Sequence, residues 1–224
     1  MKVIVTCGPG YEPIDDVRRI TNFSTGELGV RLANRLAAAG CEVTCFRGVA
    51  ATTPLPLRGA AHVAFTTTAT LREALVRHAS QHADVAAVFH AAALSDFRVS
   101  EVRGADGKPL GGAKISSRHG ALHLTLAPVG KLIAELRGIF PHSLLVGWKY
   151  ELVGDRETAL VAARAQIAEN STDACVLNGT AYGPGFGFCT AGNDDDSRPP
   201  RHLDDKEALS EFLAAWLRGK VRAA

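Results

Sequence analysis

Residues 85–92 read Val-Ala-Ala-Val-Phe-His-Ala-Ala, a continuous apolar run that predicts a central strand of a parallel sheet. Helices cover both faces of such a strand, so its side chains need not alternate between apolar and polar types. Shorter runs of the same kind recur at residues 2–6, 42–46, 62–66, 143–148, 174–177 and 187–190. Segments with helical spacing of apolar residues lie between them. This alternation predicts an α/β fold with a doubly wound, mostly parallel, Rossmann-like sheet, in a single domain over residues 1–224.

Two capping-box patterns predict where the first two helices begin. Ser24 and Glu27 have the S-x-x-E spacing before a segment with leucine at every fourth position, which Gly40 is expected to end. Thr70 and Glu73 repeat the spacing before a second helix that runs to about residue 82. Further helices are expected near residues 131–137, 155–169 and 204–218.

Residues 94–127 interrupt the alternation of strands and helices. They contain glycines, single charges and two stretches of alternating polarity, at residues 113–117 and 122–126. Alternation over a few residues is typical of half-buried strands. We therefore expect a β-hairpin that leaves the main sheet.

The composition excludes several classes of protein. The chain has 224 residues, of which 46% are hydrophobic and 21% charged, close to globular averages and unlike a disordered or coiled-coil protein. Its 25 basic and 23 acidic residues give a net charge of +2, and the basic residues do not form the stripe that nucleic-acid binding needs. No apolar run approaches the ~20 residues of a membrane span. The N-terminal residues MKVIVTCGPG lack the apolar core of a signal peptide, so none is expected.

The cysteines indicate a reducing compartment. They are Cys7, Cys41, Cys45, Cys175 and Cys189, an odd number without a C-x-x-C pair. Four of them lie inside strand-like runs, which predicts buried, reduced thiols in a cytoplasmic protein. The pattern leaves open whether Cys7, beside a glycine-containing loop, is reactive or simply buried.

Four polar segments could bind ligands. Residues 6–10 carry glycines but no G-x-G-x-x-G, which disfavours a standard dinucleotide site. Residues 20–29 offer backbone N–H groups, hydroxyls and glycines that suit a phosphate, although Ser24 equally suits a helix cap. At residues 91–97, small residues would let a flat ring approach the backbone, and Asp96 follows as a ligand or a turn carboxylate. The three consecutive aspartates within residues 193–200 fit a solvated turn better than a metal site.

Blocks of sequence over most of the chain resemble one enzyme family. Residues 5–29 read VTCGPGYEPIDDVRRITNFSTGELG, and AAALSDF, AKISS, LTLAPVGKLIAEL and VGWKYE begin at residues 91, 113, 124 and 146. The first block matches P-(I/L)-D-x-V-R-x-I-x-N-x-S-(S/T)-G-x-x-G. In this order, with a predicted strand ending at Asn178, the blocks resemble the phosphopantothenoylcysteine synthetases, the phosphopantothenate–cysteine ligases of coenzyme A synthesis. The KISS and GWKYE variants are more similar to free-standing ligases than to those fused to a flavin decarboxylase.

The resemblance implies a ligase that makes an acyl-nucleotide anhydride and couples it to the amine of L-cysteine. It implies that Asn22 contacts the carboxylate of 4′-phosphopantothenate and acts on the acyl intermediate. Lys114 would lie at the nucleotide phosphates on the hairpin, and Arg18 would serve the second half-reaction. Ala93 and Asp96 match the block beside substrate and nucleotide. Spacing alone would make Lys114 an exposed strand lysine and Arg18 a surface charge.

The resemblance also implies a nucleotide site, a cation and a dimer. The nucleotide-lining positions would be Gly8, Ser24, Gly26, Gly29, Asp96, Lys114, Ala127, Pro128, Val129, Gly130, Trp148 and Asn178. The co-substrate would be CTP, as in bacterial relatives, or ATP, as in eukaryotic ones, together with Mg²⁺. The indole of Trp148 would stack on the base or fill the core. A homodimer is implied, with the hairpin at residues 94–127 reaching the partner subunit.

Departures from the family pattern leave other functions open. Lysines that follow the GWKYE block in relatives are missing at residues 165–170, and only Arg164 beside them is basic. The T-P-(K/D) turn reads PVGK at residues 128–131, and Pro9 displaces the second glycine of the first loop. A non-catalytic nucleotide-binding or regulatory relative is therefore the alternative. An NAD(P)-dependent oxidoreductase is disfavoured by the missing glycine motif and the missing acidic ribose partner.

Overall fold

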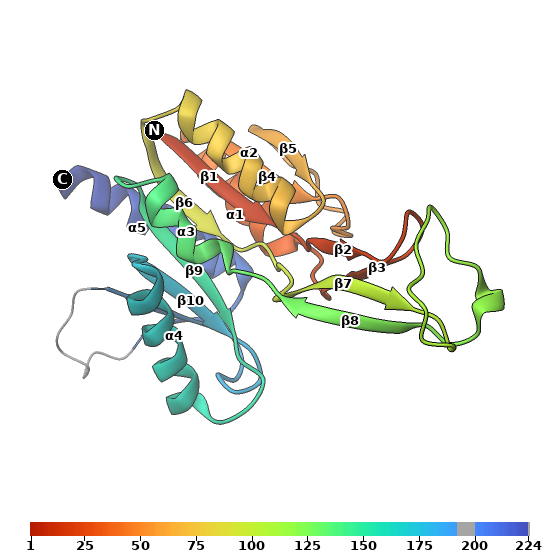
Figure 1. The fold of residues 1–224 in the computed structure, drawn as a ribbon. Coiled ribbons are helices and arrows are strands. Elements are labelled where there is room, and N and C mark those ends of the chain that lie inside the picture. Colours follow the sequence, from red (N-terminus) through yellow and green to blue (C-terminus); the bar gives the residue numbers. More distant parts are fainter. Residues whose placement is uncertain (192–199, 224) are drawn as a thin grey trace.

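The central sheet has eight strands, and six of them are parallel. In the computed structural model, which describes residues 1–191 and 200–223, the strand order is β12-β11-β10-β9-β6-β1-β4-β5 (Figure 1). The strands are β1 Lys2–Cys7, β4 Glu42–Gly48, β5 Ala60–Phe65, β6 Val85–His90, β9 Leu144–Tyr150, β10 Ala174–Asn178, β11 Phe186–Thr190 and β12 Arg201–Leu203. Only β11 and β12, at one edge, run antiparallel to their neighbours. The predicted doubly wound, mostly parallel sheet is confirmed.

The strand order reverses between β1 and β6. From β1 the chain builds outward through β4 to β5, and then returns to β6 and builds the other way through β9 to β10. Neighbouring connections leave in opposite directions at this point, which opens a crevice at the carboxyl ends of the strands. The fold therefore places a ligand site beside Cys7 and His90, where β1 and β6 end.

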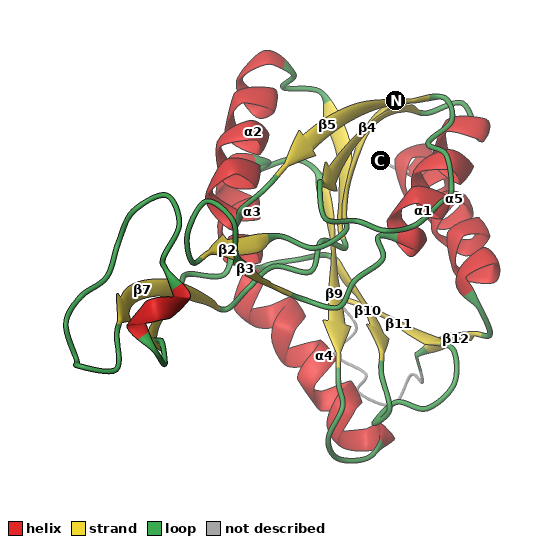
Figure 2. Ribbon diagram, turned by 90° about the vertical axis from the view of Figure 1, so that its right-hand side faces the viewer, coloured by secondary structure: helices red, strands yellow, loops and turns green. Residues whose placement is uncertain are grey.

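Helices cover both faces of the sheet. They are α1 Glu27–Ala38, α2 Thr68–Gln81, α3 Leu132–Ile139, α4 Arg156–Asn170 and α5 Lys206–Ala223. Figure 2 shows α1 and α5 on one face and α2, α3 and α4 on the other. Successive β1 side chains feed both layers, since Val3 and Val5 pack into the cluster beneath α1 and α5, whereas Ile4 packs beneath α2 and α3. Continuous apolar runs are the expected result of burial on both faces.

Both predicted capping boxes are wrong in detail. Helix α1 starts after Gly26, which has φ of 76° and ψ of 2° and provides no side-chain cap. A left-handed residue there leaves Ser24 outside the first turn. The hydroxyl of Thr25, and not that of Ser24, accepts the N–H of Glu27 at 3.3 Å. Helix α2 starts three residues earlier than predicted, because Thr67 and Thr70 form the reciprocal box. Thr70 is thus the third helical residue and not the cap.

The excursion between β6 and α3 is a two-stranded ribbon, but its first strand differs from the prediction. Strand β7, Phe97–Arg103, pairs antiparallel with β8, His123–Pro128. Residues 113–117 lie instead in the long connection between them, next to the short 3₁₀ helix Ser117–His119. A second small antiparallel pair, β2 Tyr11–Pro13 with β3 Arg19–Thr21, was not predicted from the sequence. In Figure 1 the ribbon projects from the body of the molecule beside β2 and β3.

All five cysteines are free and buried, as the sequence predicts. None of the helices within residues 1–191 and 200–223 has the length and apolar character that a bilayer crossing needs.

Candidate functional site

A cavity of about 850 Å³ opens at the carboxyl ends of the central strands. Most of its lining comes from the loop before α1 with the first turn of that helix, the segment after β6, the start of α3 and the ends of β9 and β10, and Lys206 of α5 also contributes. These segments are far apart in the sequence and meet at the point where the strand order reverses. The location is the one expected for ligands in open α/β sheets.

Nine of the predicted site residues line this cavity. They are Asn22, Ser24, Gly26, Gly29, Ala93, Asp96, Gly130, Trp148 and Asn178. The side-chain amide of Asn22 donates to the carbonyl of Leu94 at 2.9 Å, which ties the loop before α1 to the segment after β6. The first three N–H groups of α1 have no partner within the helix, and a helix N-terminus attracts anions.

Two glycines let the chain close tightly beneath the cavity. Gly8 has φ of 77°, and a Cβ there would lie 2.8 Å from the Cβ of Ala51. Its carbonyl accepts the N–H of Ala93 at 3.0 Å, so it supports the lining without belonging to it. A Cβ on Gly29 would lie 2.1 Å from that of Cys7, which shows how closely α1 rests on β1.

Arg18 and Lys114 lie together but outside the cavity of their own chain. The carboxylate of Asp15, only 1% exposed, pairs with Arg18 at 2.6 Å and accepts the N–H of Ile115 at 3.1 Å. The backbone of Asp16 also donates to Ala113. The bonded residues, Ala113 and Ile115, flank the exposed Lys114. These bonds therefore hold the connection between β7 and β8 against the β2–β3 turn.

The pKa of Asp15 reflects this crowded environment. Burial raises it, but the N–H groups of Ile115, Val17 and Arg18 and the Arg18 guanidinium outweigh burial and lower the pKa to about 2. A carboxylate that accepts several donors is strongly favoured over its acid form. Asp15 therefore stays charged at every physiological pH and anchors the connection permanently.

The remaining predicted residues lie at the root of the ribbon. Ala127 and Pro128 belong to the end of β8, and Val129 donates its N–H to the carbonyl of Asp96 at 2.9 Å. None of the three lines the cavity, whereas Gly130 immediately after them does. The root of the ribbon therefore abuts the cavity at Asp96 and Gly130.

Sequence reasoning did not single out His90 as a site residue. His90 ends β6, lines the cavity and bonds through Nδ1 to the hydroxyl of Thr6 at 2.8 Å. Burial lowers its pKa to about 4, so the ring is neutral at pH 7. The available signal was one histidine in an otherwise apolar run.

Gln166 stands in the segment of α4 where the sequence lacks the lysines expected from the family pattern. The amide of Gln166 on α4 donates to the carbonyl of Trp148 at 3.0 Å and accepts from the thiol of Cys175. It therefore bridges the helix to two strands and contributes no charge to the cavity. Cations enter the lining from elsewhere, through Lys131, Lys149 and Lys206.

Trp148 is both a core residue and a cavity residue. It packs against the apolar cluster beneath α1 and α5 and also lines the cavity. Its indole N–H is buried and finds no hydrogen-bond acceptor among the described residues.

Cys7 is a buried thiol beside the cavity. Its Sγ lies 3.7 Å from that of Cys45. The hydrogen bond with Cys45 and burial both raise the pKa of Cys7. A protonated thiol is a poor nucleophile, which favours a packing role for Cys7.

The described part of the chain shows no protein-built metal site. Within residues 1–191 and 200–223, no three His, Cys, Asp or Glu side chains are grouped to hold an ion. The three consecutive aspartates of the segment 193–200 lie outside the described residues.

Fold and cavity together define a Rossmann-like α/β protein with a cavity at its topological switch point, where small-molecule sites are expected. Residues 1–198 match the family described as the DNA/pantothenate metabolism flavoprotein C-terminal domain, and the chain belongs to this family.

Curated relatives support the family and are longer proteins. The coenzyme A biosynthesis bifunctional protein CoaBC of Thermococcus kodakarensis is 33% identical over 181 residues, covering 79% of this chain and 41% of that protein. A cysteine/cysteine sulfinic acid decarboxylase from an unknown prokaryote is 32% identical, covering 84% of this chain and 48% of that one. The chain therefore spans about half or less of the length of these relatives.

Solved structures share the fold over nearly the whole chain. The DNA/pantothenate metabolism flavoprotein of Streptococcus pneumoniae superposes with a TM-score of 0.83 at 24% identity, covering 98% of this chain and 99% of that one. A Cab2 mutant in complex with phosphopantothenate-cysteine gives 0.73 at 18% identity, covering 98% and 85%.

Proposed function

We propose that this protein joins 4′-phosphopantothenate to L-cysteine, using CTP or ATP. The observation that carries the proposal is the meeting of four motif segments at one cavity: residues 22–29, 93–96, 130 and 148. The family match and the CoaBC relatives support it, as does the likeness of the fold to a protein that binds phosphopantothenate-cysteine.

The proposed reaction has two steps. The carboxylate of phosphopantothenate attacks the α-phosphorus of the nucleotide and expels pyrophosphate. The amine of cysteine then attacks the acyl carbon, the nucleoside monophosphate leaves, and the amine gives up a proton. The first step brings two anions together, so it needs cations at the phosphates and neutral donors at the carboxylate.

The cavity residues suit these needs. The N-terminus of α1 and the three cavity lysines offer positive potential to phosphates. Asn22 offers an amide, which can polarise an acyl group without adding charge. Trp148 presents an apolar indole to the cavity, where it suits a base. Mg²⁺ would enter with the nucleotide, because the ion is usually held by phosphates plus one or two carboxylates, such as that of Asp96.

We propose that the active form is a homodimer in which the ribbon reaches the partner's cavity. Phe97, Leu124 and Leu126 leave apolar surface exposed on β7 and β8, by 48%, 37% and 44%. Lys114 lies outside its own cavity, so a two-fold arrangement would deliver it to the second copy. The buried, unpaired thiols and a phosphorylated substrate support a cytoplasmic reaction.

The first test measures pyrophosphate release. Purified protein receives Mg²⁺, 4′-phosphopantothenate and cysteine with either CTP or ATP. Release that requires phosphopantothenate, and that is lost in Lys114→Ala, supports the ligase and identifies its nucleotide. A folded protein that releases none with either nucleotide overturns it, and a non-catalytic binding role would follow from the uncharged Gln166 position.

A second test concerns the shared site. Lys114→Ala and Asn22→Ala, each expected to be inactive alone, are unfolded together, refolded and assayed. If Lys114 acts across a two-fold interface, mixed dimers hold one intact site, and about a quarter of wild-type activity returns. No recovery from a mixture shown to contain heterodimers would place Lys114 in its own subunit's site.

A further inference from the structure

Helix α5 brings a charge to the cavity from outside the segment that defines the family. The family match ends at residue 198, and α5 starts at Lys206. Lys206 is nevertheless one of the residues that line the cavity. The first residue of α5 therefore meets the first residue of α1, Glu27, at the same cavity.

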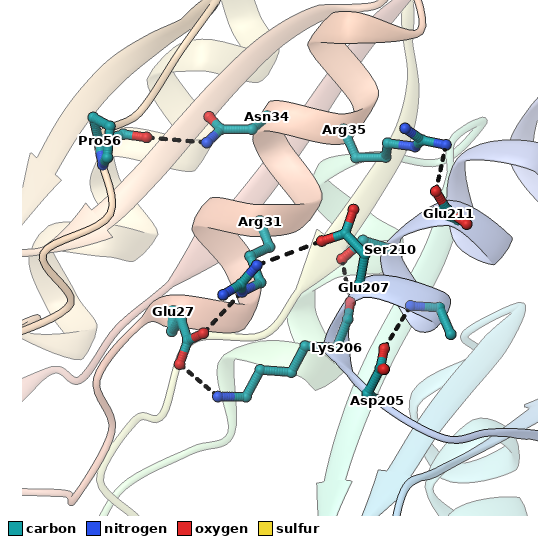
Figure 3. A network of polar contacts seen from close by, with 11 residues as sticks. Glu27, Arg31, Asn34, Arg35, Pro56, Asp205, Lys206, Glu207, Ser210 and Glu211 are labelled. Carbon is teal, nitrogen blue, oxygen red and sulfur yellow. Dashed lines mark hydrogen bonds and ion pairs between the residues drawn. The ribbon is translucent and has the colours of Figure 1, made fainter.

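Figure 3 shows the contacts that hold Lys206 there. Its Nζ donates to Oε2 of Glu27 at 2.6 Å, while Nε of Arg31 donates to Oε1 of the same carboxylate at 2.8 Å. The hydrogen bond from Lys206, followed by that from Arg31, lowers the pKa of Glu27. Glu27 is thus an anion that two cations share.

The position of this cluster matters for ligand binding. A carboxylate at the first turn of α1 would repel a phosphate from a helix end that otherwise attracts it. Lys206 and Arg31 offset that charge, and because Arg31 also pairs with the Glu207 carboxylate at 3.4 Å, the four side chains together are neutral. The Lys206 side chain stays 43% exposed, and an ammonium has three N–H donors, of which Glu27 takes one. Lys206 can therefore donate to a ligand without leaving Glu27.

The α1–α5 contact does not depend on this pair. The two helices share one apolar cluster that includes Leu32, Leu36, Leu209 and Leu213. Arg35 and Glu211 form another ion pair between the same helices at 2.8 Å, away from the cavity (Figure 3). Exposed ion pairs of this kind add little to stability.

We infer that Lys206 binds a phosphate group of the ligand in the cavity, either the triphosphate of the nucleotide or the phosphomonoester of phosphopantothenate. The inference rests on the proposed function for the presence of a phosphorylated ligand. It assigns to α5 a share of the phosphate binding that α4, with Gln166 in place of a lysine, does not supply.

Calorimetric titration tests the inference without turnover. CTP, ATP, inorganic pyrophosphate, 4′-phosphopantothenate and pantothenate are each titrated into wild type and three variants. Lys206→Met removes the cation. Glu27→Gln keeps an oxygen acceptor for Lys206 but removes the negative charge. Arg35→Met removes a cation from the same interface away from the cavity and is the matched control.

The expected effects differ in sign. Lys206→Met should weaken the phosphorylated ligand it contacts by about ten- to a hundredfold, the usual range for a charge-assisted bond, and leave pantothenate unchanged. Loss confined to nucleotide and pyrophosphate identifies the triphosphate, and loss confined to phosphopantothenate identifies the monoester. Glu27→Gln should bind at least as tightly as wild type, and Arg35→Met should bind as wild type does.

Three results would overturn the inference. The first is wild type that binds none of the phosphorylated ligands. The second is Lys206→Met that binds them all with wild-type affinity. The third is equal weakening of binding in Lys206→Met and Glu27→Gln, in step with their unfolding temperatures. If the protein binds pyrophosphate or nucleotide through Lys206 but shows no ligase turnover, the proposed function is overturned and this inference stands. Turnover with unchanged affinity in Lys206→Met would overturn this inference alone.

Discussion

Gly29→Ala should separate helix α1 from the strand beneath it. The added Cβ would lie 2.1 Å from the Cβ of Cys7 and 3.2 Å from its sulfur. Carbon atoms in contact prefer about 3.5–4.0 Å, so the helix must move by about 1.5 Å. Overpacking of a buried site costs about 1–3 kcal/mol, and here both partners belong to regular elements that yield little. We expect the upper end, about 3 kcal/mol.

Urea denaturation measures this change, and thermal unfolding should show a fall of about 6–12 °C. The matched control is Gly138→Ala in α3, where a Cβ would meet nothing within 4 Å. It should be neutral or stabilise by about 0.5–1 kcal/mol, because alanine is the better helix former. Ligase turnover of Gly29→Ala should fall about 100-fold, since small displacements of site groups have effects of that size.

A double-mutant cycle identifies the clash as the cause. Cys7→Gly removes the atom that Gly29→Ala would strike and leaves Cys7 Cα at 3.4 Å from the new methyl group. The two changes together should be at least about 1.5 kcal/mol less harmful than their sum. Additive effects, or a Gly29→Ala protein within about 0.5 kcal/mol of wild type, would refute the close packing of α1 on β1.

Three further predictions concern single side chains. Burial lowers the pKa of His90 to about 4, so the unfolded chain, in which this pKa is near 6.5, binds the proton first as the pH falls. Stability that is present above about pH 6.5 should therefore decline by about 2–3 kcal/mol towards pH 4. If the free energy of unfolding in urea changes with pH in parallel for wild type and His90→Asn, the prediction is wrong. Asp15→Asn removes the negative charge that accepts hydrogen bonds from several donors. Limited proteolysis should then cut residues 104–122 at least about tenfold faster, with little change in unfolding temperature. Equal cutting rates would show that the Asp15 carboxylate is not needed to hold this segment. Thr67→Ala removes the N-cap of α2 and should lower the free energy of unfolding in urea by about 1 kcal/mol. A larger loss in Glu73→Ala would instead support the helix start at Thr70 that the sequence predicted.

The fold could be predicted where its signal was local. Apolar runs such as residues 85–92 gave the parallel strands, because burial on both faces leaves a continuous pattern. The residues at which helices begin were harder to predict. The start of α1 depends on the left-handed backbone of Gly26, and a spacing rule for side chains does not contain that conformation.

The hairpin shows a different limit. Residues 113–117 alternate like a strand, yet bonds to Asp15 and Asp16, about a hundred residues earlier in the chain, hold them as a loop. A local pattern cannot encode an attachment at that separation. The strand that pairs with β8 is Phe97–Arg103. It begins at the last residue of the AAALSDF block and was not predicted.

The cavity itself was predicted mainly through the resemblance, which grouped residues that spacing could not join. Residues 20–29 and 91–97 were each candidate ligand segments from their composition, but the resemblance assigned Asn22 and Ala93 to one site, and the structure places both at the cavity. Lys206 had no such signal, since it follows the matched segment and reaches the cavity through the packing of α5 on α1. His90 was concealed by its apolar neighbours.

Charge is distributed in the cavity in a way that suits the joining of two anions. Its most buried ionisable lining groups, Cys7 and His90, are 1% and 7% exposed and are both uncharged at pH 7. Its charges lie on partly exposed side chains, and the Glu27 carboxylate is shared by two cations. A buried anion would raise the barrier for a carboxylate approaching a phosphate, because the repulsion would act through a low dielectric. Burial raises the pKa of a carboxyl introduced there by Cys7→Asp. Pyrophosphate release by this variant should therefore fall as the pH rises and the group ionises, far more than nucleotide binding at the exposed lysines falls, which separates the demands of the chemical step from those of binding.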